Sequence, residues 1–126
     1  MRTIKAEIEQ HMTGLQEAGR GLTARYRFPQ EFIGFQGHFP GKGILPGVCQ
    51  IQSVLSMCER WAGHGVMLRE IMVAKYATPV FPGEEIVCHI LELSDLTGEV
   101  IVRARIEKGP AKVSELKLRI APAVMR

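Results

Sequence analysis

The residues best suited to chemistry in this sequence are a histidine, His38, and the helix start that follows it at Gly47. His38 lies in a stretch rich in glycine and proline, and an imidazole can exchange protons near neutral pH. The first N–H groups of a helix have no partner within the helix, and the positive end of the helix dipole lies there too. Together the two features could remove a proton from carbon and stabilise the negative charge that develops on a neighbouring carbonyl oxygen.

A long, mostly apolar helix must carry the second of these features. The pattern predicts a helix from Pro46 to Ala62, because proline is tolerated in a first turn and glycines follow at Gly63 and Gly65. Its only charged residues are Glu59 and Arg60, so we expect it to be covered on most sides, as by a sheet. The apolar stripe consists of Ile51, Val54, Leu55, Cys58, Trp61 and Ala62.

Strands are expected to form that cover. Alternating apolar and polar residues, bounded by turn residues, predict strands over 4–9, 22–28, 66–78, 85–96, 99–108 and 112–121. Gly14 to Gly21 is expected to be a turn region, and 29–46 a long connection of the kind that is often functional. The order predicts an α+β fold, in which one central helix is wrapped by a curved antiparallel sheet of about six strands.

Composition sets the broad class. The chain has 126 residues, enough for one domain over 1–126, and its 46% hydrophobic content suits a chain with its own core. A net charge of +3, without a basic patch interleaved with aromatics, argues against nucleic-acid binding. The first residues lack an apolar signal region, and no apolar run reaches the ~18 residues of a membrane span. We therefore expect a cytoplasmic protein without a membrane span.

The three cysteines and the three histidines other than His38 lack the spacing of a metal site. Cys49, Cys58 and Cys88 are an odd number of thiols in apolar contexts, which indicates reduced core residues. The other three histidines fall in expected turns or on strand surfaces, so no bound metal is predicted; they are His11, His64 and His89.

Two segments resemble a known family. Residues 35–48 read FQGHFPGKGILPGV and residues 76–84 read YATPVFPGE. The first resembles the signature of the hot-dog-fold 3-hydroxyacyl-[acyl-carrier-protein] dehydratases, the FabZ/FabA-like proteins, and the second is similar to the strand of that family that ends in a Pro-Gly turn. Members of the family often begin with an extra helix, whereas this chain is expected to begin with the strand at 4–9.

The resemblance implies a homodimer or an assembly of dimers, with the active sites at the subunit interface. The loop histidine, here His38, would come from one subunit and the helix acid from the other. The N–H of Gly47 would bind the thioester carbonyl. The family's acid falls at Gln52, and the glutamine that the family often has one turn later is Ser56.

The resemblance also implies the substrate and the remaining site residues. The substrate would be an acyl thioester of fatty-acid, lipid or polyene-type biosynthesis, carried on the phosphopantetheine of an acyl carrier protein or on CoA, with no other cofactor. His38 and Gln52 would be the catalytic positions. The substrate-binding residues would be Gly47, Val48, Phe35 and Phe39, with Phe32 as a further wall of an acyl tunnel.

Gln52 leaves the reaction open, because an amide is no ordinary general acid, and losing a positioned acid costs ~10²–10⁴ in rate. His38 could act as base and then as acid, with Gln52 orienting the hydroxyl. Glu59 could replace the acid, but it lies roughly 10 Å further along the helix. Alternatively, the protein could be a thioesterase that holds a water at Gln52, or a non-catalytic partner of acyl carriers.

Overall fold

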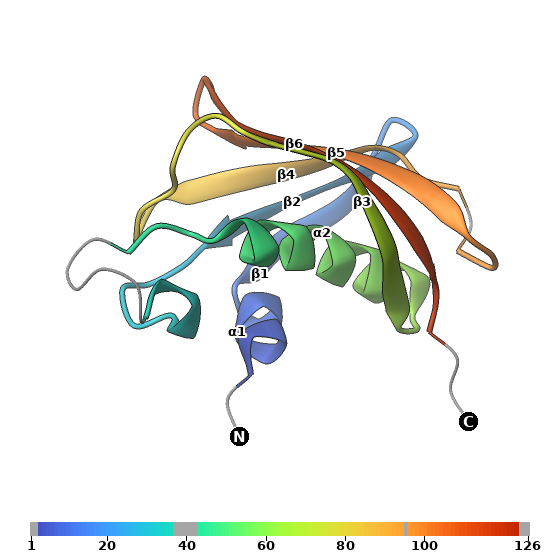
Figure 1. Ribbon diagram of the computed structural model, residues 1–126, viewed down its shortest axis with the longest axis horizontal. Coiled ribbons are helices and arrows are strands. Elements are labelled where there is room, and N and C mark those ends of the chain that lie inside the picture. Colours follow the sequence, from blue (N-terminus) through green and yellow to red (C-terminus); the bar gives the residue numbers. More distant parts are fainter. Residues whose placement is uncertain (1–2, 37–42, 95, 124–126) are drawn as a thin grey trace.

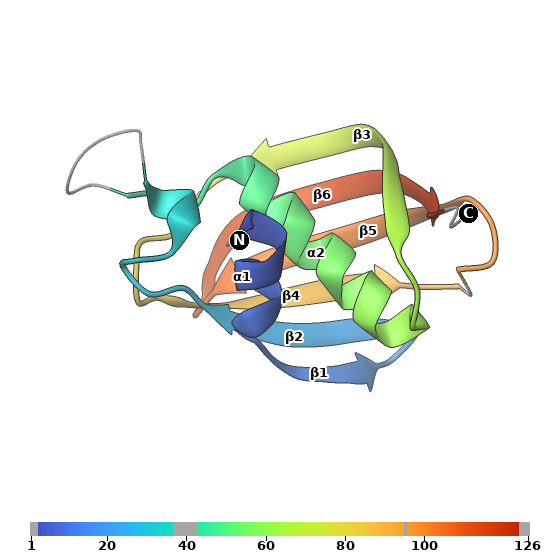
Figure 2. The ribbon, with the colours of Figure 1, turned by 90° about the horizontal axis from the view of Figure 1, so that it is seen from below.

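A six-stranded antiparallel sheet curves around one long helix, as the computed structural model shows for residues 3–36, 43–94 and 96–123 (Figure 1). The strand order is β1-β2-β4-β5-β6-β3, so that β1 and β3 are the two edges. The central helix α2 lies along the concave face, and the short helix α1 lies on the side of α2 that faces away from the sheet (Figures 1 and 2). This confirms the predicted hot-dog architecture.

The bounds of the elements agree with most of the expected ranges. The predicted central helix is α2, and four of the predicted strands correspond to β3, β4, β5 and β6, while 22–28 corresponds to β2. In chain order the elements are α1 (Ile4–Gln10), β1 (Met12–Ala18), β2 (Gly21–Arg27), the 3-10 turn η1 (Ile33–Phe35), α2 (Gly47–Ala62), β3 (Val66–Tyr76), β4 (Glu85–Glu92), β5 (Val100–Lys108) and β6 (Ala111–Pro122).

The N-terminal segment corrects the sequence-based expectation. Residues 4–9, expected as a strand, belong to the helix α1. The chain therefore does begin with the extra helix that members of the resembled family often have. Thr3 caps this helix by accepting a hydrogen bond from the Ala6 N–H at 3.0 Å. Ile4 and Ile8 are four residues apart, which is one helical turn and also two strand repeats. Over so short a segment the two periods cannot be separated by counting.

The first strand is the second correction. Residues 12–18 form β1, although Gly14 to Gly21 was expected to be a turn region. Gly14 has a positive φ of 64° and lies at an irregularity in the pairing of β1 with β2, between Thr13 and Gln16. A glycine of this kind forms a bulge within a strand. The true turn of the hairpin is at Gly19, and β1, as a largely exposed edge strand, has little alternation to detect.

The core lies between α2 and the concave face of the sheet. Its fully buried side chains include Val54 and Met57 from the helix and Ile106 and Leu118 from the strands. The three cysteines are free and buried, as predicted. Desolvation raises the pKa of Cys49 to about 11 and contributes most to raising that of Cys58 to about 12, so these thiols stay protonated at neutral pH. No helix among the described residues is both long and apolar enough to cross a membrane.

One buried hydrogen bond joins the helix to the sheet. The hydroxyl of Tyr26, on β2, donates to the carbonyl oxygen of Ser53 at 2.7 Å, and Tyr26 is fully buried. The Ser53 hydroxyl in turn donates to the Cys49 carbonyl at 2.8 Å. A buried hydroxyl without a partner is costly, so the Tyr26 bond favours the position of α2 in which the Ser53 carbonyl lies within reach of β2.

We predict that Tyr26→Phe lowers the free energy of unfolding by about 1–2 kcal/mol, because it removes a buried hydrogen bond and leaves the ring packing in place. Urea unfolding followed by circular dichroism measures this. Tyr76→Phe is the matched control, since Tyr76 is half exposed, and it should change stability by less than about 0.5 kcal/mol. Equal stability of Tyr26→Phe and the native protein would contradict the assigned role of this bond.

Candidate active site

The start of α2 presents backbone donors without partners in the described part of the chain. Pro46 is the N-cap, in an extended conformation, and its side chain makes no capping hydrogen bond. Among the described residues, neither the Gly47 N–H nor the Val48 N–H has a hydrogen-bond partner, whereas the next two N–H groups of the helix both donate to the Pro46 carbonyl. Free N–H groups at the positive end of a helix dipole are suited to binding an anion or an oxyanion.

The fold holds this helix start beside the segment that follows β3. Leu45, just before the helix, donates its N–H to the Val80 carbonyl at 2.8 Å. The N–H of Ala77 donates to the Val113 carbonyl, also at 2.8 Å, which keeps the segment on the sheet. Two stretches that are far apart in the sequence are therefore joined by backbone hydrogen bonds at the mouth of the site.

A mostly apolar cavity of about 530 Å³ opens there. Two of the residues predicted to bind substrate, Phe35 and Gly47, line this cavity. A few polar side chains in an otherwise apolar pocket are typical of a small-molecule site. The lining residues are Phe35, 43–47, Gln50 and 76–79.

Tyr76 lies directly against the helix start. A Cβ atom built on Gly47 would collide with the Tyr76 hydroxyl and its ring carbon, so a larger residue there would displace the Tyr76 ring. Burial raises the pKa of Tyr76 above its ordinary value, so its hydroxyl stays protonated and can donate a hydrogen bond at neutral pH. The sequence reasoning cited Tyr76 only as part of the resemblance and gave it no role in the site.

Two other expected site residues, Val48 and Phe32, are not among the described residues that line this cavity. Val48 is 70% exposed on the outer side of the helix, and Phe32 is buried in the core, where it stacks on Phe28 with ring centroids 4.6 Å apart. His38 and Phe39, the expected base and a tunnel residue, lie outside the described residues.

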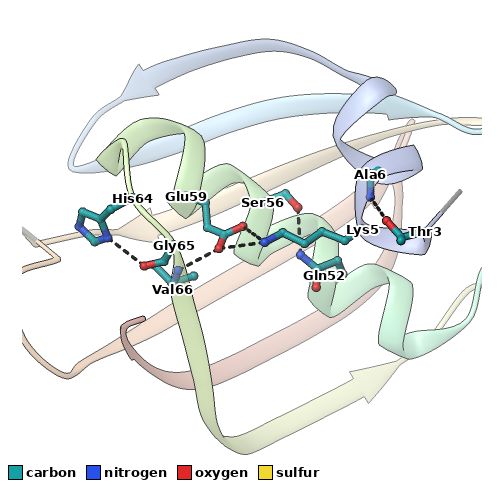
Figure 3. A network of polar contacts seen from close by, with 9 residues as sticks. All are labelled: Thr3, Lys5, Ala6, Gln52, Ser56, Glu59, His64, Gly65 and Val66. Atoms are coloured by element: carbon teal, nitrogen blue, oxygen red, sulfur yellow. Dashed lines mark hydrogen bonds and ion pairs between the residues drawn. The ribbon is translucent and has the colours of Figure 1, made fainter. Parts of the chain in front are cut away.

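Gln52 lies on another flank of α2. Its side-chain amide donates to the hydroxyl of Ser56 at 3.0 Å, and Ser56 is buried (Figure 3). Gln52 is not among the residues that line the cavity beside Gly47. Within one chain, therefore, the position of the family acid and the helix start face different directions.

Glu59, the other acid considered on α2, has a structural role. Its carboxylate forms an ion pair with Lys5 of α1 at 2.9 Å and accepts the Val66 N–H at 2.9 Å (Figure 3). The Glu59 side chain is 13% exposed and that of Lys5 is 52% exposed, so the carboxylate is largely buried while the ion pair is open to water on the lysine side. Glu59 thus connects α1, α2 and the beginning of β3. These bonds are a second argument against a catalytic role, in addition to its distance along the helix.

The histidines in the described part of the chain form separate local contacts. His89 lies 2.9 Å from a Glu107 oxygen on the sheet, and His64 Nδ1 lies 2.9 Å from the Gly65 carbonyl. His11 packs edge-on against Phe28. Among the described residues no group of three or more histidines, cysteines or acids is arranged to hold a metal.

Gln50 is the functional candidate that the sequence reasoning missed. It lines the cavity and is only 4% exposed, although it carries a polar amide. The available signal was its position three residues after Gly47, where it interrupts an apolar stretch on the same side of the helix.

Comparison with known proteins places the chain in a family. A family model for ApeI-like proteins, described as ApeI dehydratase, matches residues 14–115, which is most of the chain. The 3-hydroxyacyl-[acyl-carrier-protein] dehydratase FabZ of Pediococcus pentosaceus is 30% identical over 111 residues, which are 81% of this chain and 73% of that protein. FabZ of Lactobacillus helveticus is 33% identical over 91 residues; these are 65% of this chain and 62% of that protein, so the chain spans less than two thirds of this relative.

Solved structures support the same architecture. The dehydratase heterocomplex ApeI:P of Xenorhabdus doucetiae contains a chain that superposes with a TM-score of 0.73 at 20% identity, covering 87% of this chain and 96% of that one. A candidate esterase of Mycobacterium tuberculosis superposes with a TM-score of 0.63 at 11% identity, covering 97% of each chain. These similarities concern the fold, whereas the family assignment depends on sequence. The chain belongs to the ApeI-like dehydratase family, with the hot-dog fold that its sequence predicted.

Proposed function

We propose that this protein binds 3-hydroxyacyl thioesters at the start of α2 and acts as a (3R)-3-hydroxyacyl-[acyl-carrier-protein] dehydratase-like protein in fatty-acid, lipid or polyene-type biosynthesis. The observation that carries the proposal is the Gly47 N–H, which has no partner among the described residues and belongs to a residue in the wall of an apolar cavity; the Val48 N–H beside it is also without a described partner. The thioester carbonyl oxygen would accept hydrogen bonds there, and the cavity would hold the acyl chain. The slight positive charge of the chain would favour an acidic carrier protein.

The proposed dehydration removes a proton from C2, forms the C2–C3 double bond and releases the 3-hydroxyl as water. The neutral imidazole of His38 removes a proton from C2, and the electrons move onto the thioester oxygen, which the helix-start N–H groups stabilise. The electrons then return to form the C2–C3 double bond as the C3–O bond breaks. The departing hydroxyl takes a proton, from the His38 imidazolium or from an acid of a partner subunit, and leaves as water. The Gln52 side chain would reach that hydroxyl from a partner subunit, because within one chain it does not line the cavity at the helix start.

An assay with His38→Ala separates this reaction from its alternatives. The protein is incubated with 3-hydroxyacyl and enoyl pantetheine thioesters, while enoyl absorbance and free thiol are both recorded. We expect interconversion that His38→Ala reduces by at least ~10²-fold, since a positioned base is lost. Free thiol without enoyl formation would instead identify a thioesterase, a fold-compatible alternative given the similarity to the candidate esterase. Carrier binding with neither signal would identify a non-catalytic partner.

Gln52→Glu tests the missing acid. A carboxyl group at this position would supply the general acid that the family normally has, and we expect dehydration to rise at least about tenfold. The adjacent Ser56 hydroxyl can donate to the new carboxylate, so the substitution fits locally. Gln16→Glu on β1, where the side chain is exposed, is the matched control and should leave the rate unchanged. A flat rate for Gln52→Glu, with activity lost in His38→Ala, would show that position 52 has no role in proton transfer.

We further propose that the protein works as a dimer through β3. This edge strand pairs only with β6 in the described sheet, so its outer backbone groups are available to a second subunit. Exposed apolar residues lie along it and at the helix start: Met67, Ile71, Tyr76 and Val48. The partner is a second copy or, as in the ApeI:P heterocomplex of Xenorhabdus doucetiae, a different subunit. A different subunit with an acid at the position of Gln52 could complete the site that contains His38.

Ile71→Lys should disrupt this dimer, because a lysine in the middle of β3 introduces charge where two edges would meet. Analytical ultracentrifugation of the protein, alone and mixed with a candidate partner subunit, is expected to show a shift to monomer. Ile101→Lys is the control: Ile101 is equally exposed, at 48% against 47% for Ile71, but it lies on β5 inside the sheet. The β3 interface is ruled out if both variants remain dimeric, or if the native protein is itself a monomer in both samples.

A further inference from the structure

The side-chain amide of Gln50 is buried without a partner in the described part of the chain. Gln50 is 4% exposed, its Oε1 is inaccessible to water, and no hydrogen bond joins its side chain to any described residue. Buried polar groups in proteins are nearly always hydrogen-bonded, so an exception needs an explanation. The amide lies in the wall of the cavity that opens at the start of α2, which suggests that its partner is a bound molecule.

The other buried polar side chains of α2 do have partners. Ser53 donates to the Cys49 carbonyl within the helix, and Ser56 accepts a hydrogen bond from Gln52. The packing of the helix can therefore satisfy polar groups where they serve structure alone. Gln50 differs because it lies on the cavity side, where an apolar residue would pack equally well.

The position of Gln50 relative to Gly47 indicates which part of a ligand it would meet. The two residues are three apart on α2, so they share one side of the helix within a single turn of about 5.4 Å. Side chains on a helix lean toward its N-terminus, which brings the amide over the turn that begins at Gly47. A thioester carbonyl held by the Gly47 N–H would place the carbons nearest the carbonyl beside this amide.

We propose that Gln50 is a positioning and specificity residue, whose amide hydrogen-bonds the 3-hydroxyl of the bound acyl thioester. This inference depends on the proposed function. The Nε2 group of the amide can donate to a hydroxyl oxygen, whereas a hydrocarbon chain offers no acceptor. A saturated acyl thioester would leave the Gln50 amide buried and unpaired, so the site prefers hydroxylated chains.

Binding of two stable analogues tests the preference. The probes are the pantetheine amides of (3R)-3-hydroxyhexanoic acid and of hexanoic acid, in which an amide replaces the reactive thioester, and calorimetry measures both affinities. We expect the native protein to bind the hydroxylated probe about tenfold or more tightly than the saturated one. Gln50→Met should remove most of that difference, chiefly by weakening the hydroxylated probe. Gln50→Leu is a second apolar variant, and Gln16→Met, on exposed β1, is the matched control.

The outcomes distinguish this inference from the function on which it depends. If the native protein binds both probes and the ratio of the two affinities is the same in Gln50→Met and Gln50→Leu, the role of Gln50 is wrong and the acyl-thioester site stands. If the native protein binds neither probe, the acyl-thioester site fails and the inference fails with it. A merely structural role would weaken both probes together, and thermal unfolding of each variant would record it separately.

Discussion

The structure depends on the enclosure of α2 by the sheet, because an apolar helix of this length must be buried along most of its surface. Burial fixes where the helix ends. Its C-terminus closes at Gly63, in the left-handed conformation, and its N-terminus reaches the rim at Pro46. At that rim the first N–H groups meet neither the sheet nor a capping side chain of the described residues. The unpartnered N–H groups at the helix start are thus a consequence of how the core is built.

Rigid contacts hold this helix start in place before any ligand arrives. The Tyr26 hydroxyl bond to the Ser53 carbonyl sets the helix against β2, and Glu59 connects the far end of the helix to α1 and β3. Donors that are fixed in advance stabilise a developing charge without the cost of reorganisation. The acid that α2 does carry is Glu59, and its ion pair and backbone bond use it for this architecture rather than for proton transfer.

The polar groups of α2 are divided between two sides. Gly47 and Gln50 face the cavity beside Tyr76, whereas Gln52 and Ser56 bond to each other on a different flank. A single chain therefore presents two separate halves: the cavity that we propose binds the thioester, and the flank where Gln52 occupies the position of the family's acid. The exposed apolar edge along β3 lies next to the first half, since Tyr76 ends that strand. A second subunit that pairs there would bring two halves together, which makes the identity of that subunit decisive for the reaction.

The pattern of residues along the chain was enough to predict the central helix, five of the six strands and the family, because long periodic segments and a motif of many fixed positions are unambiguous. Phe35 and Gly47, both predicted to bind substrate, line the cavity at the start of α2. Local pattern failed at the ends: over 4–9 the helical and strand periods coincide, and Gly14 forms a bulge where it looked like a turn. The folded arrangement was needed to show that Gln50 and Tyr76 share a cavity with Gly47, that Gln52 lies on another flank, and that Glu59 connects α1, α2 and β3. Those facts depend on which side of α2 meets which part of the sheet, a relation that spacing along one chain does not contain.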